Sequence, residues 1–546
     1  MVLAILEVSQ KQAYIFGSKR LMENVNRSEI IRYVTDVPPD EESFIKEAYP
    51  AFDRDKNLVY AGGGHTILQF GSEQEAVAMV KAVTRRAYMD YGLELFAKVE
   101  KCDPTRPGES ITNLIKALDR KKNLRLSSFR RLGTGLEKTE DKRSRPVNED
   151  EGKGKDNDND YRYEHPKYME DIIRQENNSK DKTEKKENFY AVVHIDGNSM
   201  GAKSQEVTDK AGGDWEECRR LHQKFSKGID DAFRNALKAT ILEVERWQTA
   251  GLLKEPLGFD DTGEFHPIRP LISAGDDICF IVPAKIALRC AEFFLQWLDK
   301  NGKIEIERSN REYIRFKLSA CAGIAMVHEK YPFYRAYQMS EALCSSAKKY
   351  ASALGTEVSA MDWHIEYGQA KEGLSAIRED YLTADSGSGS GRDDPIRTLT
   401  LRPVVAAGEI DPEIAAKNNT VPTKFRTYSF FEDLVTCFKE GRVKGENNEV
   451  KIIEIPKSKI KRLRPELKKS EDHTELYIRM NSIPDISKLA FTAVTKDDLK
   501  AAVEAGGRRA LLCAEDEVQG KHYRRSLYFD AIEIMDKFAV IEEGTE

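Results

Sequence analysis

The chain has 546 residues, of which 40% are hydrophobic and 33% are charged, and 86 basic against 92 acidic residues give a net charge of −6. This length predicts two to four domains. The slight acidic excess excludes a protein that is basic overall, so any nucleic-acid surface has to be local. No apolar run reaches the about 20 residues that a membrane span needs, and the short, acidic N-terminal stretch does not resemble a secretory signal. We therefore expect a cytoplasmic protein with no membrane partner.

Eight cysteines are spread along the chain, and no two of them have the CxxC spacing of metal sites and redox motifs. Several, such as Cys279 and Cys321, lie within apolar runs. This pattern predicts buried free thiols in a reducing compartment and argues against a zinc site.

Residues 1–105 predict a small domain that alternates strands and helices. We expect, in order, a strand, a helix, a β-hairpin and a helix, at residues 3–8, 9–25, 58–70 and 73–95. The hairpin tip is bare backbone, because it consists of Gly62, Gly63 and Gly64. This order of elements is typical of a ferredoxin-like palm domain.

Residues 106–188 predict a helical and charged insert. A helix is expected at 114–126, whereas residues 137–188 are nearly all charged or polar. Such a segment cannot bury enough apolar surface to fold on its own, so we expect the insert to be partly disordered.

The same order of elements recurs in residues 189–383, which predicts a second palm domain and an internal duplication. Residues 189–201 read as an apolar strand that ends in a carboxylate, and residues 269–282 read as strand, tight turn and strand. The remaining expected elements are helices at 215–247, 284–298 and 337–351 and a strand at 316–325.

Three carboxylates are expected to converge in this second palm. Asp196 ends the first apolar run, and Asp276 and Asp277 form the hairpin tip, so two neighbouring strand ends would bring all three together. Such a cluster repels itself unless a divalent cation is bound, and oxygen-only ligands suit Mg²⁺ or Mn²⁺. Two such ions about 4 Å apart can activate a hydroxyl group and stabilise a leaving pyrophosphate. Alternatively, these Asp residues serve only the turn geometry, in which they are common.

The first palm differs from the second at these positions. Its hairpin tip reads GGGH where the second reads AGDD, and its first strand ends in Glu7, Val8 and Ser9. Because it lacks the carboxylate cluster, we expect the first palm to be catalytically inactive. Its glycines either only form the turn or let a nucleotide approach the backbone closely.

The C-terminal third predicts a linker and a further domain. Residues 384–394 are rich in Ser and Gly and predict a flexible linker, and residues 395–546 predict a mainly helical domain. Its expected helices lie at 429–439, 496–505 and 525–538. The basic run at 457–469 is either a solvated helix face or a surface that follows a nucleic-acid backbone.

Five stretches resemble, in this order, the large polymerase-cyclase subunit of type III CRISPR effector complexes, whose palm is related to the GGDEF cyclases: residues 6–25, 189–201, 269–282, 319–351 and 361–368. The resemblance implies an α+β fold with two ferredoxin-like palm domains and a small C-terminal helical domain. It also implies a metal-dependent nucleotidyltransferase that polymerises and cyclises ATP into cyclic oligoadenylate, a second messenger of RNA-sensing antiviral defence. The implied partners are guide and target RNA, small helical subunits and RAMP-type subunits.

The resemblance also implies roles for individual residues. Asp196, Asp276 and Asp277 would be catalytic and would hold two Mg²⁺ or Mn²⁺ ions, with the backbone near Ile195 as a further ligand. Lys348 would meet the triphosphate, although a lysine at a helix end is equally explained by the helix dipole. The implied nucleotide contacts are Ser9, Gly62, Gly63, Gly64 and Gly275.

The chain departs from this family at Asn198, which follows Gly197 where a second Asp is frequent, and in three further respects. It has no His-Asp dipeptide, so we expect no HD-type nuclease activity; it has no cysteine-rich zinc element; and Ala274 stands where the family usually has Gly. Two alternatives therefore stay open. One is a structural, RNA-binding subunit of a CRISPR ribonucleoprotein with a vestigial palm, and the other is an orphan nucleotide cyclase outside CRISPR.

Overall fold

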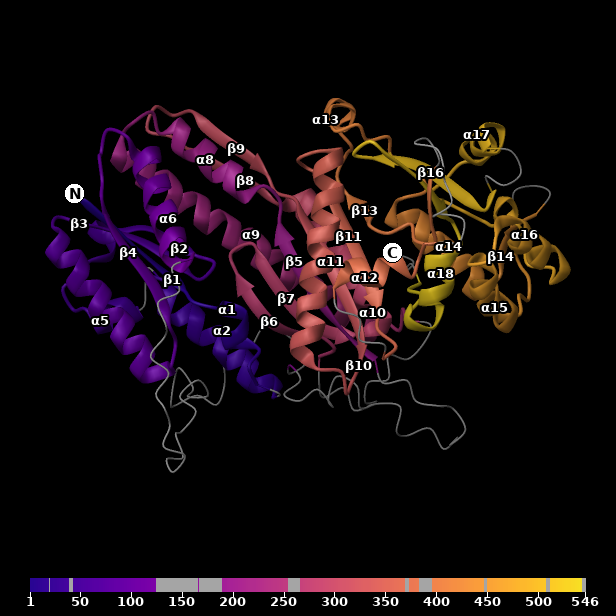
Figure 1. The fold of residues 1–546 in the computed structure, drawn as a ribbon, viewed down its shortest axis with the longest axis horizontal. Coiled ribbons are helices and arrows are strands. Elements are labelled where there is room, and N and C mark those ends of the chain that lie inside the picture. The colour runs from indigo at the N-terminus through magenta and orange to yellow at the C-terminus, as the bar shows by residue number, and fades with distance from the viewer. Residues whose placement is uncertain are drawn as a thin grey trace.

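Figure 1 shows the chain in a computed structural model, coloured from indigo at the N-terminus to yellow at the C-terminus. The structure describes residues 1–18, 20–38, 43–123, 165, 189–253, 266–368, 373–382, 395–445, 449–506 and 511–542. The charged segment expected at 137–188, apart from His165, and the linker expected at 384–394 lie outside the described residues. None of the described helices combines the length and the apolar character needed to cross a membrane.

The N-terminal part is a four-stranded antiparallel sheet, in the order β2-β3-β1-β4, with helices packed on it. Its strands are β1 (Val2–Val8), β2 (Leu58–Gly62), β3 (His65–Phe70) and β4 (Leu95–Lys101). Its helices are α1 (Lys11–Ile15), α2 (Leu21–Thr35), α3 (Phe44–Ala48), α4 (Arg54–Asn57), α5 (Glu73–Tyr91) and α6 (Pro107–Asn123). The glycine-tipped hairpin is thus present as predicted.

Two helix predictions in this part were inaccurate. The helix expected at 9–25 is divided into α1 and α2. The helix expected at 73–95 begins as predicted, where Ser72 and Glu75 form a capping box, but it ends at Tyr91. Gly92 ends it because it adopts a left-handed conformation with φ of 62°, and β4 follows as a strand that the prediction missed.

The second palm is built on a six-stranded sheet in the order β13-β11-β10-β5-β7-β6. Its strands are β5 (Phe189–Gly197), β6 (Arg269–Ala274), β7 (Asp277–Pro283), β10 (Ala320–His328), β11 (Ser359–Ile365) and β13 (Val404–Ala407). Its helices are α8 (Met200–Lys210), α9 (Trp215–Thr249), α10 (Ala284–Asn301), α11 (Phe333–Leu354) and α12 (Leu374–Glu379). The strand expected at 316–325 is in fact two strands, because β9 (Tyr313–Lys317) pairs separately with β8 (Lys303–Glu307).

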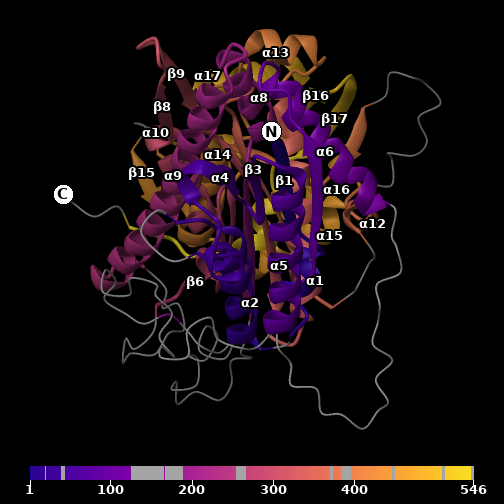
Figure 2. The same ribbon diagram turned by 90° about the vertical axis from the view of Figure 1, so that its left-hand side faces the viewer.

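The two palms share a hydrophobic core. Alternate residues of β5 point to opposite faces of the sheet. Ala191 and Val193 pack in the cluster that includes α9 and α10, whereas Tyr190 and Val192 pack in the cluster that includes the first palm. Figure 2 shows the first palm in front of the second. Because β5 is covered on both faces, its sequence is continuously apolar rather than alternating.

Strand register makes the duplication explicit. β1 lies between β3 and β4, just as β5 lies between β7 and β10. Glu7 pairs with His65 in the first palm, and Asp196 pairs with Asp277 in the second. The glycine at the tip has φ of 64° in both hairpins, at Gly63 and at Gly275. Equivalent positions of the two palms can therefore be compared residue by residue.

The C-terminal part is mainly helical, with short strands. Its helices are α13 (Pro412–Lys417), α14 (Tyr428–Glu440), α15 (Lys457–Leu467), α16 (Glu471–Met480), α17 (Lys496–Gly506) and α18 (Phe529–Ile534). Its other strands are β12 (Ile396–Thr398), β14 (Arg442–Lys444), β15 (Val450–Ile452), β16 (Cys513–Val518) and β17 (Lys521–Ser526). The helix expected at 525–538 was wrong at its start, because Arg525 lies in strand β17. Its guanidinium forms an ion pair with Asp516 of β16 at 2.8 Å.

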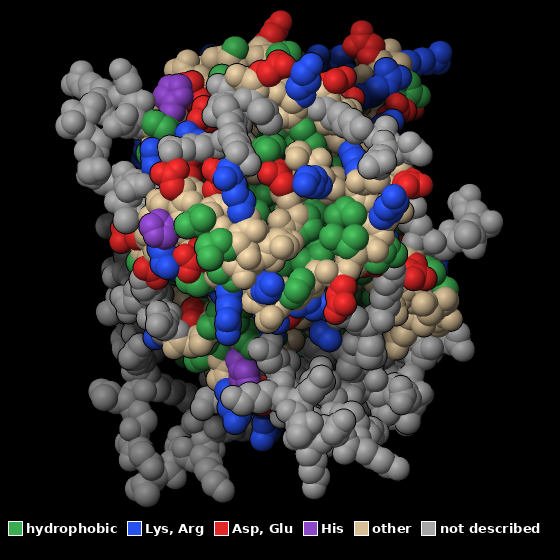
Figure 3. Space-filling model, turned by 90° about the vertical axis from the view of Figure 1, so that its right-hand side faces the viewer, with side chains coloured by type: hydrophobic (Ala, Val, Ile, Leu, Met, Phe, Trp, Pro, Cys, Tyr) green, Lys and Arg blue, Asp and Glu red, His purple; other side chains and the backbone are tan. Residues whose placement is uncertain are grey.

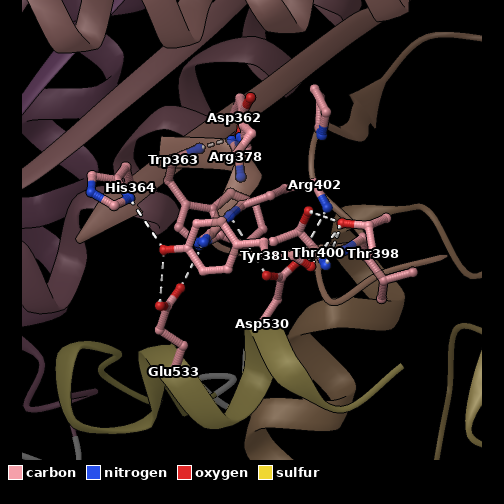
Figure 4. A network of polar contacts seen from close by, with 12 residues as sticks. Asp362, Trp363, His364, Arg378, Tyr381, Thr398, Thr400, Arg402, Asp530 and Glu533 are labelled. Carbon is pink, nitrogen blue, oxygen red and sulfur yellow. Dashed lines mark hydrogen bonds and ion pairs between the residues drawn. The ribbon is translucent and has the colours of Figure 1, made fainter. Parts of the chain in front are cut away.

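A buried polar network fastens the C-terminal part to the second palm (Figure 4). Arg402 contacts Glu533 at 2.7 Å and Asp530 at 3.6 Å, and its guanidinium lies over the rings of Trp363 and Tyr381. Buried charges are tolerated when they are paired and hydrogen-bonded. Because Trp363 belongs to β11 while the acidic residues belong to α18, the network ties the palm sheet to the C-terminal part.

The face formed by the C-terminal part carries apolar side chains among charges of both signs (Figure 3). Ile452 of β15 is 76% exposed, and Met480 of α16 is 75% exposed.

Candidate active site

The three predicted carboxylates meet at one end of the second palm sheet. Asp196 lies opposite Asp277 in the β5–β7 ladder, and Asp276 stands in the turn between β6 and β7. The Gly197 N–H donates to the Asp276 carbonyl at 3.2 Å. A β-carbon on Gly197 would lie 2.9 Å from the side chain of Asp276, so the glycine makes room for that carboxylate. Gly275 gives the turn its left-handed conformation.

Burial and neighbouring charges shift the pKa values of Asp276 and Asp277 in this cluster. Burial, Asp196 and Asp277 together raise the pKa of Asp276 to about 7. Burial also acts to raise the pKa of Asp277, but Lys11 and His194 outweigh it and hold that pKa below its usual value. One carboxyl group thus resists ionisation while its neighbour is stabilised as the anion.

Two lysines neutralise the outer members of the cluster. Lys348 of α11 contacts Asp196 at 2.7 Å and donates to the Gly197 carbonyl at 2.7 Å. Lys11 of α1 contacts Asp277 at 2.8 Å, and it comes from the first palm. The structure places Lys348 beside Asp196, and its expected contact with a triphosphate remains a prediction. Lys11 was missed: nothing in its sequence context distinguishes it, and only the packing of one palm on the other reveals it.

The donor types in this cluster suit a divalent cation, but their placement does not yet form a metal centre. Three carboxylates supply oxygen ligands, and Asp277 Oδ1 is buried without a hydrogen-bond partner in the part of the chain that the structure describes. Across those residues, however, no three or more His, Cys, Asp or Glu side chains are grouped so that they could hold a metal ion. Lysine ammonium groups instead contact two of the three carboxylates.

The carbonyl predicted near Ile195 lies inside the sheet. Ile195 pairs with Ile278 on one side and with Ala322 on the other. Backbone groups of a central strand bond mainly to its neighbours. The Gly197 carbonyl, at the strand end, is the one that contacts Lys348. A backbone ligand at Ile195 remains a prediction.

The glycine tip of the first palm lies against the carboxylate hairpin. A β-carbon on Gly275 would lie 3.7 Å from the Gly63 nitrogen. Helix α9 holds both tips, because Ser226 donates to the Ala61 carbonyl at 2.7 Å and Asp230 accepts from the Gly275 N–H at 3.2 Å. The two hairpin tips predicted to flank a nucleotide are therefore neighbours.

Ser9 and Ala274 occupy less central positions. Ser9 follows β1, and its N–H donates to the Glu94 carbonyl at 2.9 Å. Ala274 pairs with Asp277 at the base of the turn and packs against the core cluster of the first palm. The methyl group of Ala274 thus contributes to the contact between the palms. A nucleotide contact at Ser9 remains a prediction.

Comparisons with known proteins place this domain in a family. Residues 189–353 match the family model for the second palm domain of Cas10/Cmr2. No curated protein matches the chain. Among solved structures, the chain is similar to that of a Csm1–Csm4 cassette in complex with cA4, at 14% identity and a TM-score of 0.41 over 66% of this chain and 53% of that one.

Two further structures are similar to the same degree. The cassette in complex with cA3 has 15% identity and a TM-score of 0.42, and the Csm1–Csm4 subcomplex of the type III-A CRISPR-Csm interference complex has 14% and 0.41. Each comparison covers 66% of this chain and 54% of the other, so this chain spans about half the length of those proteins. The resemblance inferred from sequence is confirmed for the second palm, and residues 189–353 are a palm domain of the Cas10/Cmr2 family.

Proposed function

We propose that the chain is a nucleotidyltransferase that joins ATP molecules into a cyclic oligoadenylate. The observation that supports this most directly is the meeting of Asp196, Asp276 and Asp277 at one sheet end of a Cas10/Cmr2-type palm. Burial, together with the charges of Asp196 and Asp277, raises the pKa of Asp276 to about 7, so ionised Asp276 opposes folding. A chemical role would explain why the chain contains it.

In the proposed reaction, the 3′-oxygen of one nucleotide attacks the α-phosphorus of another. The new O–P bond forms as the bond from the α-phosphorus to the bridging oxygen of the β-phosphate breaks. Pyrophosphate leaves, and the hydroxyl proton passes to solvent. The same step within one linear product closes the ring.

Several features of the chain suit this chemistry. Mg²⁺ or Mn²⁺ ions, held by Asp196, Asp276 and Asp277, would activate the hydroxyl and neutralise charge on the phosphates. Lys348 places a further positive charge beside Asp196. Gly63 and Gly275 leave the meeting point of the two hairpin tips without side chains, so the backbone is open to a phosphate group there. The first palm, with Gly64 in place of Asp276, would bind but not catalyse.

The proposal includes work within a ribonucleoprotein that contains guide and target RNA together with small helical and RAMP-type subunits. The exposed apolar side chains on α16 and β15 fit a protein partner. Helix α15 exposes Lys457, Lys459 and Arg462, which fit contact with a nucleic-acid backbone. Its other two cations, Lys461 and Arg464, contact Asp536 and Glu533 instead.

The test is to incubate the purified chain with Mg²⁺ or Mn²⁺ and each nucleoside triphosphate, alone and with co-purifying RNA. Pyrophosphate release and new oligonucleotides are measured by mass spectrometry. We expect a cyclic adenylate product that disappears in the Asp276→Asn/Asp277→Asn variant. A product that survives in this variant would refute the site assignment. The absence of product under every condition, together with tight RNA binding, would favour a structural subunit instead.

A further inference from the structure

Lys11 is a residue of the first palm whose ammonium group sits among the carboxylates of the second. Its Nζ lies 2.8 Å from Asp277 Oδ2, and Asp276 and Asp196 add to the electrostatic attraction on it. Its stem lies against the glycine tip, since a β-carbon on Gly64 would be 3.8 Å from Lys11 Cδ. No function assigned so far uses this lysine.

Lys11 is positioned by the packing of helix α1 on helix α11. Helix α1 is anchored on α11, because Gln12 donates to Glu341 and the ring of Phe16 packs 4.1 Å from that of Tyr337. Gln10, just before Lys11, has a left-handed backbone with φ of 50°. Strained non-glycine residues of this kind cluster at functional sites.

A divalent cation and Lys11 would satisfy the same oxygen atoms. Asp277 contacts Lys11 through Oδ2, while its Oδ1 has no hydrogen-bond partner among the described residues and lies 3.7 Å from His194 Nδ1. A cation that binds Asp277 through Oδ2 would therefore have to displace Lys11.

We infer that Lys11 competes with a divalent cation for Asp277, so that the first palm holds the carboxylate cluster closed until a cation displaces its lysine. The inference rests on the proposed function, because it concerns the same carboxylates. The catalytically inactive palm then acts as a positioning element: its lysine neutralises Asp277 when the cation is absent and is released towards the meeting point of the hairpin tips when the cation binds.

The experiment is a Mn²⁺ titration of the full chain without nucleotide, followed by the electron paramagnetic resonance signal of free Mn²⁺. We expect Lys11→Met, which keeps the stem and removes the charge, to bind Mn²⁺ about three- to tenfold more tightly than the wild type. Lys11→Arg should bind as the wild type does. The matched control is Lys122→Met, which breaks the Lys122–Glu7 pair of the first palm at 2.7 Å and should leave the affinity within about twofold.

One result of the titration would overturn the inference, and another concerns the proposed function. An unchanged or weaker affinity in Lys11→Met, when Asp276→Asn/Asp277→Asn abolishes binding, would reject competition by Lys11 and leave the site assignment intact. If the double Asp variant binds Mn²⁺ as the wild type does, the carboxylate site itself is wrong.

A second measurement does not depend on how the variants fold. Wild-type chain is acetylated briefly with and without Mn²⁺, and modification of each lysine is read by mass spectrometry. We expect Mn²⁺ to increase acetylation of Lys11 severalfold while Lys122 stays unchanged. Equal acetylation of Lys11 in both conditions would contradict its release.

Discussion

The two palms share a backbone arrangement but differ in the charges at the hairpin tip and at the end of the neighbouring strand. Three positions correspond in register, and they are Glu7, Gly64 and His65 in the first palm and Asp196, Asp276 and Asp277 in the second. In each palm, a lysine contacts the carboxylate at the end of the central strand. Lys122 of α6 contacts Glu7 in the first palm, and Lys348 of α11 contacts Asp196 in the second. Only the second adds two more carboxylates at the hairpin tip.

This difference separates what the turn geometry needs from what the proposed chemistry would need. The hairpin turn forms with glycines alone, as at Gly63, so Asp276 is not required for the geometry of the turn. Its pKa of about 7 shows that the folded state penalises its charge. A buried group whose charge is disfavoured in this way is a candidate for a functional role.

The largest expected effect is on product formation, and it comes from replacing the carboxylate at the end of β5. Asp196→Asn should reduce product formation at least about 100-fold, because it removes a carboxylate that would hold the divalent cations of the proposed reaction. Glu7→Gln, at the equivalent position of the first palm, should stay within a few-fold of the wild type. Initial rates of pyrophosphate release measure both. Equal losses would mean that the first palm is not the inactive copy.

The second expected effect is on stability, and it depends on how closely helix α11 packs on strand β10. A β-carbon on Gly323 of β10 would lie 1.9 Å from the Ser340 carbonyl oxygen and 2.2 Å from the Cys344 nitrogen of α11. Gly323→Ala should therefore cost about 3 kcal/mol of unfolding free energy, since backbone must move to admit the methyl group. Lys98, its register equivalent in β4, should tolerate alanine within about 0.5 kcal/mol. Urea denaturation measures both, and a benign Gly323→Ala would refute the close packing that places Lys348.

The smallest effect is a pH-dependent gain in stability. Asp276→Asn should raise the unfolding free energy by about 2 kcal/mol at pH 8, because it removes a charge that burial and two neighbouring carboxylates disfavour. The sign follows from the raised pKa: the folded state holds the proton more tightly, so the penalty is absent below the ordinary pKa of 3.8 and grows until about pH 7.

Melting temperatures across this pH range provide the measurement for Asp276→Asn. Glu7→Gln offers the contrast, because it breaks an ion pair with Lys122 and should lose up to about 1 kcal/mol instead. A stability gain that is the same at pH 4 and pH 8 would show that the charge of Asp276 is not the cause.

Local signals in the sequence were sufficient for the main elements of both palms. The apolar runs of β5 and β7 and the glycine and Asp turns between strands depend on neighbours along the chain, so they could be recognised from periodicity and turn chemistry. The strand-end position of Asp196 and the tip position of Asp276 and Asp277 follow from the same signals. Their meeting also required the pairing of β5 with β7, which the strand order of the palm implied.

Errors arose where a distant partner outweighs local preference. Arg525 was expected in a helix, but it lies in a strand because β17 pairs with both β16 and β12. β4 was missed because its strand is defined by pairing with β1. Intrinsic propensity is a weak prior that such tertiary contacts override.

The sequence by itself determined the duplicated palms and the three carboxylates, because strands, turns and register depend on short-range patterns. Only the tertiary structure decided what surrounds those carboxylates. Lys11 is 266 residues from Asp277 along the chain, and no periodicity connects them. They meet because β5 and the first palm bury apolar faces in one shared core. The hydrophobic effect that drives this burial is non-directional, so it can join residues at any separation along the sequence.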